Sequence, residues 1–555
     1  MKNASSVLYE KNHPAMLRLY YDGPVPLNFC NPWFRETEKG KSYPFKCSGT
    51  VKLLSAHKIK LTTVFTASGK GSAVIGAGCP RHFEVFCNGR LCCSTLTEGT
   101  LYDALAPENH VFPVPVKAGK NTLEFFIEPG PRSTPFCCGV LGKEALKLPM
   151  LLYPPVHTHP GERTLTVIAR TMGNIGCGME YREKGSAQWD LLWDHRAGVI
   201  RRRTLHKFFL ENLTPGALYE YRMVMIDPKD PDKKRRTRLF SFTAPPDKSK
   251  KSCTFFFTAD PQFEPERQRG LLRGLLDAAA GKECDFLVFG GDINSRYSNL
   301  RVEKDLVGTI QKHASPGKTV IMLRGNHELR GPEPDAFADF WGDSRNRTYG
   351  MFRHGDTAFL VLDAWENRPS DHPRSKYYSR YNLDDLFKEE EKAFIHTAVN
   401  SPDWQNARRR IVMAHGAPFS HYDKADTMFR FLQELTDEFF CGKEPFSKVH
   451  LWFAGHTHIY TRSLPLSSEI AAFAPPRAPG KSGEQYIFPV FTGCGPNKKG
   501  LPQLSGFKTE CHEDGTITVS SILPDGTVFE KIQINEDHSV KELISLPHFI
   551  PEPEL

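Results

Sequence analysis

The segment TVIMLRGNHE (residues 319–328) joins an apolar run to a turn with ligand-type side chains, and this order recurs along the second half of the chain. The apolar runs TFFFTA, DFLVFG, RIVMA and VHLWFA also end directly before oxygen or imidazole ligands. Because ligands of open α/β sheets bind outside the carboxyl ends of the strands, the runs predict five strands that end at one crevice. The residues that follow them are Asp260, Gln262, Asp292, Asn326, His327, Glu328, His415, His456 and His458.

This set contains the donor types that a pair of divalent ions needs. Two ions about 3.5 to 4 Å apart stabilise both the attacking and the leaving oxygen of a displacement at phosphorus. They require hard carboxylate oxygens, imidazole nitrogens and one carboxylate that touches both ions. Gly-Asp and Gly-Asn alone are ordinary turn dipeptides, and a single histidine after a strand is most often structural. Their joint occurrence after five apolar runs indicates a two-metal hydrolase.

The motif order Asp-x-Gln, Gly-Asp, Gly-Asn-His-Glu, His and Gly-His-x-His resembles that of the calcineurin-like metallophosphoesterases, over about residues 250–535. The resemblance implies that His327 stabilises the leaving-group oxygen or the phosphoryl group and that Glu328 orients His327. It also implies two ions, with the ligands Asp260, Gln262 and His458 for the first, Asn326, His415 and His456 for the second, and Asp292 as the bridge.

The chain departs from related enzymes at two places. Many family members have His or Gly where this chain has Gln262, and a neutral amide oxygen is a poorer ligand than imidazole, so a hydrogen bond to a ligand is the alternative role. Purple acid phosphatases carry Tyr three residues after the bridging Asp, where this chain has Ser295. No purple tyrosinate–iron centre is therefore expected. Arg296 stands where phosphoprotein-phosphatase-like members hold the phosphate with an arginine; a solvated loop arginine is the alternative.

Residues 1–148 contain short apolar runs separated by Gly, Asn and Pro turns, which predicts a β-sandwich. An Asn-Gly hairpin signal lies within FEVFCNGRLCCST (residues 83–95). Residues 110–130 alternate apolar and polar side chains before and after a Gly-Lys-Asn turn. The pattern resembles galactose-binding-like jelly rolls, which implies either carbohydrate binding or a scaffold.

Residues 149–245 resemble the fibronectin-III-like β-sandwich that precedes the catalytic domain in purple acid phosphatases. The segment LENLTPGALYEYRMVMID (residues 210–227) places a Pro-Gly turn before an alternating strand, whose tyrosines we expect to pack the sandwich at a corner. We also expect residues 1–245 to fold without the catalytic domain, because they contribute none of the predicted ligands.

Beyond residue 250 the spacing of the apolar residues changes. Strand-like runs alternate with helical stretches of i, i+3, i+4 apolar spacing at residues 265–280, 299–313 and 383–399. Alternating strands and helices imply a layered sheet structure. We predict an αββα sandwich over residues 250–535, followed by a C-terminal tail at 536–555.

Composition excludes several other classes. The chain of 555 residues has 25% charged and 39% hydrophobic residues, and no apolar run is long enough to span a membrane. The first residues lack the apolar core of a secretory signal, which favours a cytoplasmic protein. Fourteen cysteines without a Cys-x-x-Cys motif favour buried, reduced thiols. The basic clusters interleave no aromatic residues, so no nucleic-acid partner is expected.

We predict a metal-dependent phosphomonoesterase whose nucleophile is a hydroxide bridging two ions, which are Mn, Fe or Zn by ligand hardness. A phosphodiesterase, including one for cyclic nucleotides, is the first alternative, because the ligands alone do not separate the two ester classes. A carbohydrate- or protein-binding module with a vestigial metal domain is the second. The complete ligand set argues against the second alternative, since a decaying site loses an Asp or His first.

Overall fold

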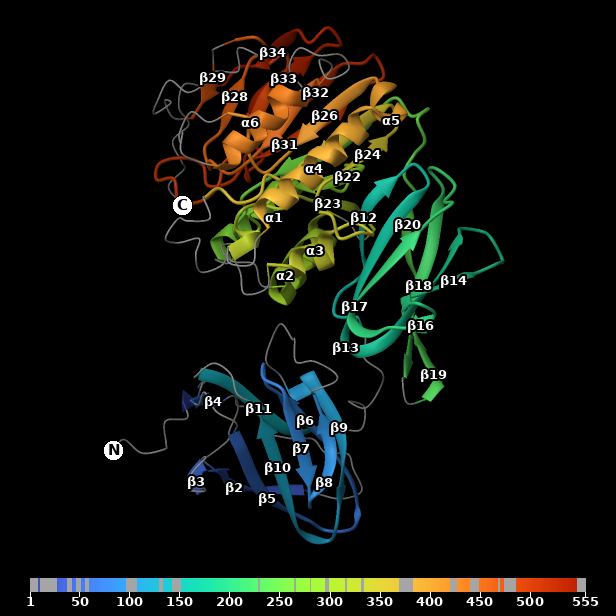
Figure 1. Ribbon diagram of the computed structural model, residues 1–555, viewed down its shortest axis with the longest axis vertical. Coiled ribbons are helices and arrows are strands. Elements are labelled where there is room, and N and C mark those ends of the chain that lie inside the picture. The colour runs from blue at the N-terminus through green and yellow to red at the C-terminus, as the bar shows by residue number, and fades with distance from the viewer. Residues whose placement is uncertain are drawn as a thin grey trace.

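The computed structural model describes residues 8–9, 27–36, 42–45, 51–54, 59–95, 107–128, 133–141, 151–227, 230–263, 266–279, 281–294, 299–314, 317–330, 334–368, 383–419, 427–439, 449–467, 470–473 and 486–546. Three regions follow one another along the chain: a first β-sandwich, a second β-sandwich and a mixed α/β domain (Figure 1). Among the described residues, no helix is long and apolar enough to cross a membrane.

The first sandwich consists of two antiparallel sheets. One sheet has the order β1 (Leu8–Tyr9), β4 (Val51–Leu54), β11 (Ser133–Leu141), β6 (Gly71–Gly78), β9 (His110–Val116). The other has the order β3 (Ser42–Phe45), β2 (Leu27–Glu36), β5 (Ile59–Ala67), β10 (Gly119–Ile127), β7 (Phe83–Cys87), β8 (Arg90–Ser94). A short 3-10 helix, Pro107–Asn109, precedes β9. Alternate residues of β5, β7 and β10 point into a core between the sheets, as half-buried strands do.

The expected hairpin forms between β7 and β8. Asn88 and Gly89 both have positive φ, 51° and 78°, which is the conformation of a two-residue hairpin turn. The Gly-Lys-Asn turn behaves differently. Gly119, Lys120 and Asn121 are the first residues of β10, and β9 ends at Val116. Because β9 and β10 belong to different sheets, the short connection at residues 117–118 carries the chain across the sandwich.

The second sandwich is built around one long strand, β13 (Thr164–Glu183). The first part of β13 pairs with β12 (Val156–Gly161) and β17 (Arg202–Leu210). Its second part pairs with β18 (Leu218–Asp227) and β14 (Asp190–Trp193). The remaining strands are β15 (His195–Arg196), β16 (Val199–Ile200), β19 (Asp230–Arg236) and β20 (Phe240–Thr243). The Tyr219 hydroxyl accepts a hydrogen bond from the backbone N–H of Thr214 at 3.0 Å, which is the corner arrangement expected for this tyrosine.

The α/β domain contains two facing sheets. The first has β21 (Cys253–Thr258), β22 (Phe286–Phe289) and β23 (Thr319–Met322) in parallel, extended by the antiparallel strands β31 (Gly506–Cys511), β32 (Ile517–Ile522), β33 (Val528–Ile534) and β34 (Val540–Ile544). The second has the order β24 (Gly350–His354), β25 (Thr357–Val361), β26 (Arg409–Met413), β27 (Leu451–Ala454), β30 (Val490–Thr492), β28 (Thr461–Ser463), β29 (Ile470–Ala472).

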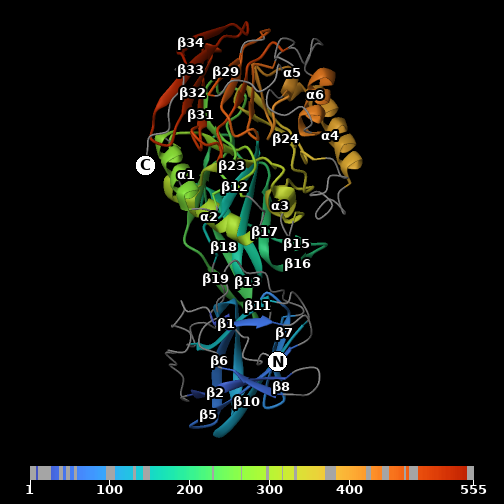
Figure 2. The same cartoon turned by 90° about the vertical axis from the view of Figure 1, so that its left-hand side faces the viewer.

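Helices cover the outer face of each sheet, and the predicted αββα architecture is confirmed. The inner core joins residues of both sheets, such as Phe257 and Phe453. One outer core holds α1 (Glu266–Ala278), α2 (Asn299–His313) and α3 (Ala336–Trp341); the other holds α4 (Asp384–Val399), α5 (Pro402–Gln405) and α6 (Thr427–Phe439). Figure 2 shows α1 and α4 on opposite sides of the sheets. Since both faces of β22 and β26 are covered, all residues of these strands are buried, without alternation.

The second sandwich and the α/β domain share a β-sheet and an apolar core. β12 continues the first sheet by pairing in parallel with β23, where His157 lies opposite Thr319. Tyr153 and Val156 belong to the same apolar core as helices α1 and α2. At this junction Glu303 of α2, fully buried, accepts hydrogen bonds from Arg170 at 2.7 and 2.9 Å.

Candidate metal centre

Five strand ends meet at one site. β21, β22 and β23 are parallel to one another, as are β26 and β27 in the facing sheet. Two to four residues beyond these ends lie Asp260 after β21, Asp292 after β22, Asn326 after β23, His415 after β26 and His456 after β27. The convergence of strand ends that the sequence predicts is therefore present.

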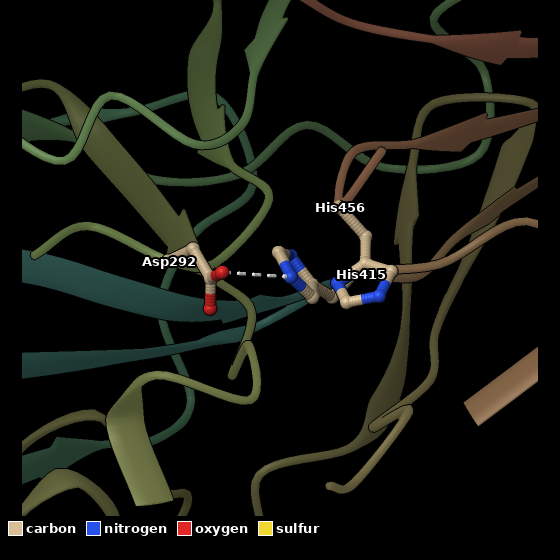
Figure 3. Close-up of side chains that lie close together, drawn as sticks. All are labelled: Asp292, His415 and His456. Atoms are coloured by element: carbon tan, nitrogen blue, oxygen red, sulfur yellow. Dashed lines mark ion pairs between the residues drawn. The ribbon is translucent and has the colours of Figure 1, made fainter. Parts of the chain in front are cut away.

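Two groups of side chains at this site can each hold an ion. The ligand atoms of Asp292, His415 and His456 lie within 4.8 Å of one another, and so do those of Asp260, Asp292 and His458. Figure 3 shows the first group, whose three side chains converge from different strand ends. Asp292 belongs to both groups. The arrangement is that of a binuclear site with one shared carboxylate.

The hydrogen bonds of two histidines show that these residues fit cations. The Nδ1 atoms of His415 and His458 contact the carbonyl oxygens of Gly290 and Pro496, each at 2.7 Å, so each Nδ1 carries the proton. Their Nε2 atoms then turn lone pairs towards carboxylates. Nε2 of His458 lies 3.2 Å from Asp260 Oδ1, and that buried oxygen has no hydrogen-bond partner. Buried acceptors that face one another need a proton or a metal cation between them.

The electrostatics of the site agree with this reading. Burial alone would lower the pKa of His415, but Asp292 and Asp260 raise it to about 10. Burial would likewise raise the pKa of Asp292, yet His415 and His327 hold it below its usual value. Each shift arises because the buried carboxylates and imidazoles stabilise one another's charged forms away from water. The two carboxylates of the site therefore favour positive charge between them.

The backbone that presents these side chains adopts an uncommon conformation. Non-glycine residues with positive φ include Asp260 (53°), Gln262 (36°), Asp292 (51°), His456 (72°) and His458 (61°). A left-handed residue costs about 1–3 kcal/mol and persists where the surroundings fix it, typically at functional sites. Here the surroundings fix these residues by close packing: a Cβ at Gly325 would collide with the Asp292 carboxylate.

The Glu328 carboxylate makes contacts that the sequence did not predict. The family resemblance implied that Glu328 orients His327, which stays a prediction; the carboxylate accepts the backbone N–H groups of Gly325 (2.8 Å), Asp292 (2.8 Å) and Ile293 (2.9 Å). Burial and the neighbouring Asp292 raise the Glu328 pKa to about 7. Glu328 thus fixes the loop that carries the shared carboxylate against the next strand end.

His327 lies at the edge of the site, and it belongs to neither ligand group found among the described residues. Its backbone N–H donates to Asp292 Oδ1 at 2.8 Å, and its Nε2 lies 3.7 Å from Asp292 Oδ2. About a quarter of its side chain is exposed, whereas the side chain of Asp292 is almost completely buried. The imidazole can therefore reach a bound substrate.

The other predicted residues differ in how the structure places them. Asn326 is buried against both His415 and His456. Gln262 lies beside the group of Asp260, Asp292 and His458, with its amide nitrogen 3.4 Å from His458 Nε2. Ser295 and Arg296 lie outside the described residues, so their expected roles stay predictions.

Two further residues at the site were not identified from the sequence. Arg330 contacts His327 Nε2 at 3.0 Å and forms an ion pair with Glu366 at 2.7 Å. Arg330 follows the Gly-Asn-His-Glu motif by two residues. Glu366 follows the apolar run TAFLVL (residues 357–362), a sixth strand-like run with acidic residues after it. That run was the signal that could have indicated Glu366.

Comparison with known proteins agrees with this site. Residues 253–460 match the family model of the calcineurin-like phosphoesterases, so this part of the chain is a calcineurin-like metallophosphoesterase domain. A sequence search of curated proteins finds no match.

Two of the solved structures that this chain matches are the following. PhoD is 10% identical with a TM-score of 0.48, over 73% of this chain and 94% of that chain. The purple acid phosphatase PPD1 from yellow lupin (Lupinus luteus) seeds is 14% identical with a TM-score of 0.48, over 90% and 96%. At these scores the likenesses carry no argument about activity.

Proposed function

We propose that the protein hydrolyses phosphate monoesters with two divalent ions. The observation that supports this most directly is the sharing of Asp292 by two adjacent ligand groups. Bound ions would supply the hydroxide nucleophile and neutralise the phosphoryl oxygens. The mixed oxygen and imidazole donors suit Mn, Fe or Zn, and we favour Mn or Fe. The proposed ligands are Asp260, Gln262, Asp292, Asn326, His415, His456 and His458.

Two residues of the chain would position the bridging carboxylate and stabilise the leaving group. Glu328 holds the Asp292 loop by accepting its backbone N–H groups, so the carboxylate is aimed before a substrate arrives. His327, which lies at the exposed edge, would stabilise the departing alcohol oxygen or the transferring phosphoryl group. Such a donor is worth about 10² to 10⁴ in rate.

The choice of monoesters over diesters is supported by Arg330. The Arg330 guanidinium lies beside His327, next to the position that a phosphoryl group would take between His327 and the ligand groups. Glu366 offsets the charge of this guanidinium, but its N–H donors would suit the additional anionic oxygen of a monoester. A phosphodiesterase stays the alternative outcome of the test.

The test is a titration of Mn²⁺ into metal-free protein, with p-nitrophenyl phosphate and bis-p-nitrophenyl phosphate as substrates. We expect the monoester to be hydrolysed faster once two ions are bound per chain. Asp292→Asn should lower the metal stoichiometry and abolish turnover, with the circular dichroism spectrum unchanged. Asp277→Asn, which alters a carboxylate on α1 more than half exposed, is the control and should keep full activity. Full activity of Asp292→Asn would exclude the two-metal site.

A further inference from the structure

The segment that leads into β17 concentrates positive charge on a hairpin of the second sandwich. Residues 195–203, HRAGVIRRR, contain four arginines and no acidic residue. They form β15, β16 and the start of β17, and Figure 2 shows β15 and β16 at the side of the second sandwich. Ala197 and Gly198, with φ of 49° and 81°, form the two-residue turn. The hairpin therefore has a defined shape without any partner.

The register of the hairpin gives it two different faces. His195 lies opposite Ile200, and Arg196 lies opposite Val199. Because side chains alternate along a strand, these two pairs point to opposite sides. Ile200 faces the sandwich, since a Cβ added at Gly176 would lie 3.1 Å from its Cγ2 atom. Val199 therefore faces outwards, and its exposed fraction of 70% is the largest among the large apolar side chains of the described residues.

The arginines of this hairpin are only partly neutralised. Arg203 forms an ion pair with Asp194 at 2.7 Å. In the part of the chain that the structure describes, no carboxylate lies within 4.0 Å of the Arg196, Arg201 or Arg202 guanidinium groups. Burial and the neighbouring Arg203 lower the pKa of Arg201, and Arg196 adds to this repulsion. A negatively charged partner would relieve it.

An outward valine among arginines fits the boundary between water and hydrocarbon. At a membrane surface, arginines interact with anionic headgroups while an aliphatic side chain enters the edge of the acyl region. A single-stranded nucleic acid would also attract the arginines. However, the hairpin presents no Phe, Tyr or Trp on which a base could stack, and Val199 would gain nothing from such a partner. The combination of charge and exposed aliphatic surface favours lipid.

We propose that the hairpin of residues 195–203 docks the protein on anionic membranes. Arg196, Arg201 and Arg202 contact the lipid headgroups, and Val199 enters the edge of the acyl region. The contact is peripheral and reversible, because three cations and one aliphatic side chain bind far more weakly than a spanning segment does. Docking is separate from the proposed hydrolysis, since none of these residues belongs to the metal centre.

Cosedimentation with vesicles tests this proposal. The full chain is mixed with vesicles of phosphatidylcholine alone or with about 30% phosphatidylserine, which supplies the negative surface potential. We expect binding to the anionic vesicles only, and weaker binding as the salt concentration rises. The triple variant Arg196→Gln, Arg201→Gln, Arg202→Gln should bind about 100-fold more weakly, which is about five-fold per arginine. Val199→Gln should bind about 3- to 10-fold more weakly, because it removes only the apolar contact.

The first sandwich contains a matched control. Its β7–β8 hairpin also turns through two residues of positive φ, and it exposes Arg90 together with Leu91, which is 50% exposed. That hairpin has a single arginine, so the double variant Arg90→Gln, Leu91→Gln should keep wild-type vesicle binding. Circular dichroism spectra and Mn²⁺ binding like those of the wild type show that each variant is folded.

Three results would overturn the proposal. Absence of wild-type binding to anionic vesicles, or equal binding by the triple variant, would exclude a membrane contact at this hairpin. Full vesicle binding by Val199→Gln would mean that charge alone is recognised and that no side chain enters the acyl region. Tighter binding of the wild type to a single-stranded oligonucleotide than to vesicles, lost in the triple variant and kept in Val199→Gln, would assign the hairpin to nucleic acid instead.

Discussion

The two β-sandwiches differ in what their apolar faces contact. The first encloses a core made of its own residues between 59 and 140. The second has a core of its own but also adds Tyr153, Val156, Ile168 and Leu205 to the core beneath α1 and α2. It continues the catalytic sheet through β12 and places Arg170 against the buried Glu303. A sandwich before an enzyme domain can thus be a separate module or a part of the enzyme's own architecture.

The largest effect on folding should come from truncating the chain after residue 148 or after residue 245. Removal of residues 1–148 should leave a soluble, metal-binding and active protein, because the first sandwich keeps its own core. Removal of residues 1–245 should give an unfolded or aggregated protein, because it exposes the apolar face of α1 and α2 and the edge of β23. Solubility, circular dichroism and Mn²⁺ binding of the two fragments are the measurements.

This expectation differs from the one drawn from the sequence, by which residues 1–245 fold without the catalytic domain and contribute none of its ligands. Active, folded 246–555 would restore the earlier view. An inactive but folded 149–555 would mean that the first sandwich contributes to the site.

The next largest effect is the difference in stability lost when a buried ion pair and a partly exposed ion pair are broken. Glu303→Ala leaves Arg170 buried without its partner, and we expect a loss of about 3–5 kcal/mol in the free energy of unfolding. Lys60 and Glu124 in the first sandwich form a 3.2 Å pair whose side chains are 33% and 23% exposed. Glu124→Ala should cost at most about 1 kcal/mol.

Urea unfolding of the full chain, followed by tryptophan fluorescence and circular dichroism, measures both effects. Equal costs for the two variants would contradict the distinction between a shared and a separate sandwich. The double variant Arg170→Met with Glu303→Leu should recover most of the loss, since it leaves no buried charge.

Bound metal should affect the unfolding temperatures of the two sandwiches differently. A ligand that binds only the folded state stabilises it by about 2.7 kcal/mol when its free concentration is 100 times Kd. We expect EDTA to lower the unfolding temperature of the second sandwich and the catalytic domain together, and to leave that of the first sandwich unchanged. Differential scanning calorimetry of the full chain and of 149–555 assigns the transitions. A shift of both transitions would show that the first sandwich is coupled to the metal site.

Sequence patterns predicted the local features of this fold well. An apolar run followed by a ligand-bearing turn is a local signal, and all five runs are strands that end at the site. The spacing at residues 299–313 coincides with α2. The Asn-Gly signal forms its hairpin because two residues with positive φ suffice.

Features that depend on distant residues could not be predicted in this way. The pairing of β12 with β23 joins His157 to Thr319, and nothing in either segment alone indicates the other. The same holds for the pair of Arg330 with Glu366. The contacts of Glu328 could not be predicted for a related reason: the resemblance implied that Glu328 orients His327, while the folded chain also brings the backbone of Asp292 and Ile293 to its carboxylate.

The smallest effect is a dependence on pH that arises within the second sandwich. His157 is buried beside the rings of Tyr221 and Phe242, at centroid distances of 5.5 and 5.4 Å, and neither ring nitrogen has a hydrogen-bond partner. Burial lowers its pKa from 6.5 to about 3. Protonation therefore favours the unfolded chain: the contribution is complete above pH 6.5 and is lost as the pH falls from 6.5 towards 3, by at most about 1.4 kcal/mol per pH unit.

His157→Phe removes this titration while keeping an aromatic ring among aromatic rings. We expect the urea midpoint of fragment 149–555 to fall less between pH 7.5 and pH 5 in His157→Phe than in the wild type. His195→Gln, at an exposed position, is the control and should keep the wild-type dependence. The transition of the first sandwich should keep its own acid sensitivity in His157→Phe, because burial lowers the pKa of His110 there to about 4. An unchanged pH dependence in fragment 149–555 would place its acid sensitivity outside the shared junction, and the two sandwiches would then differ in packing but not in their response to protons.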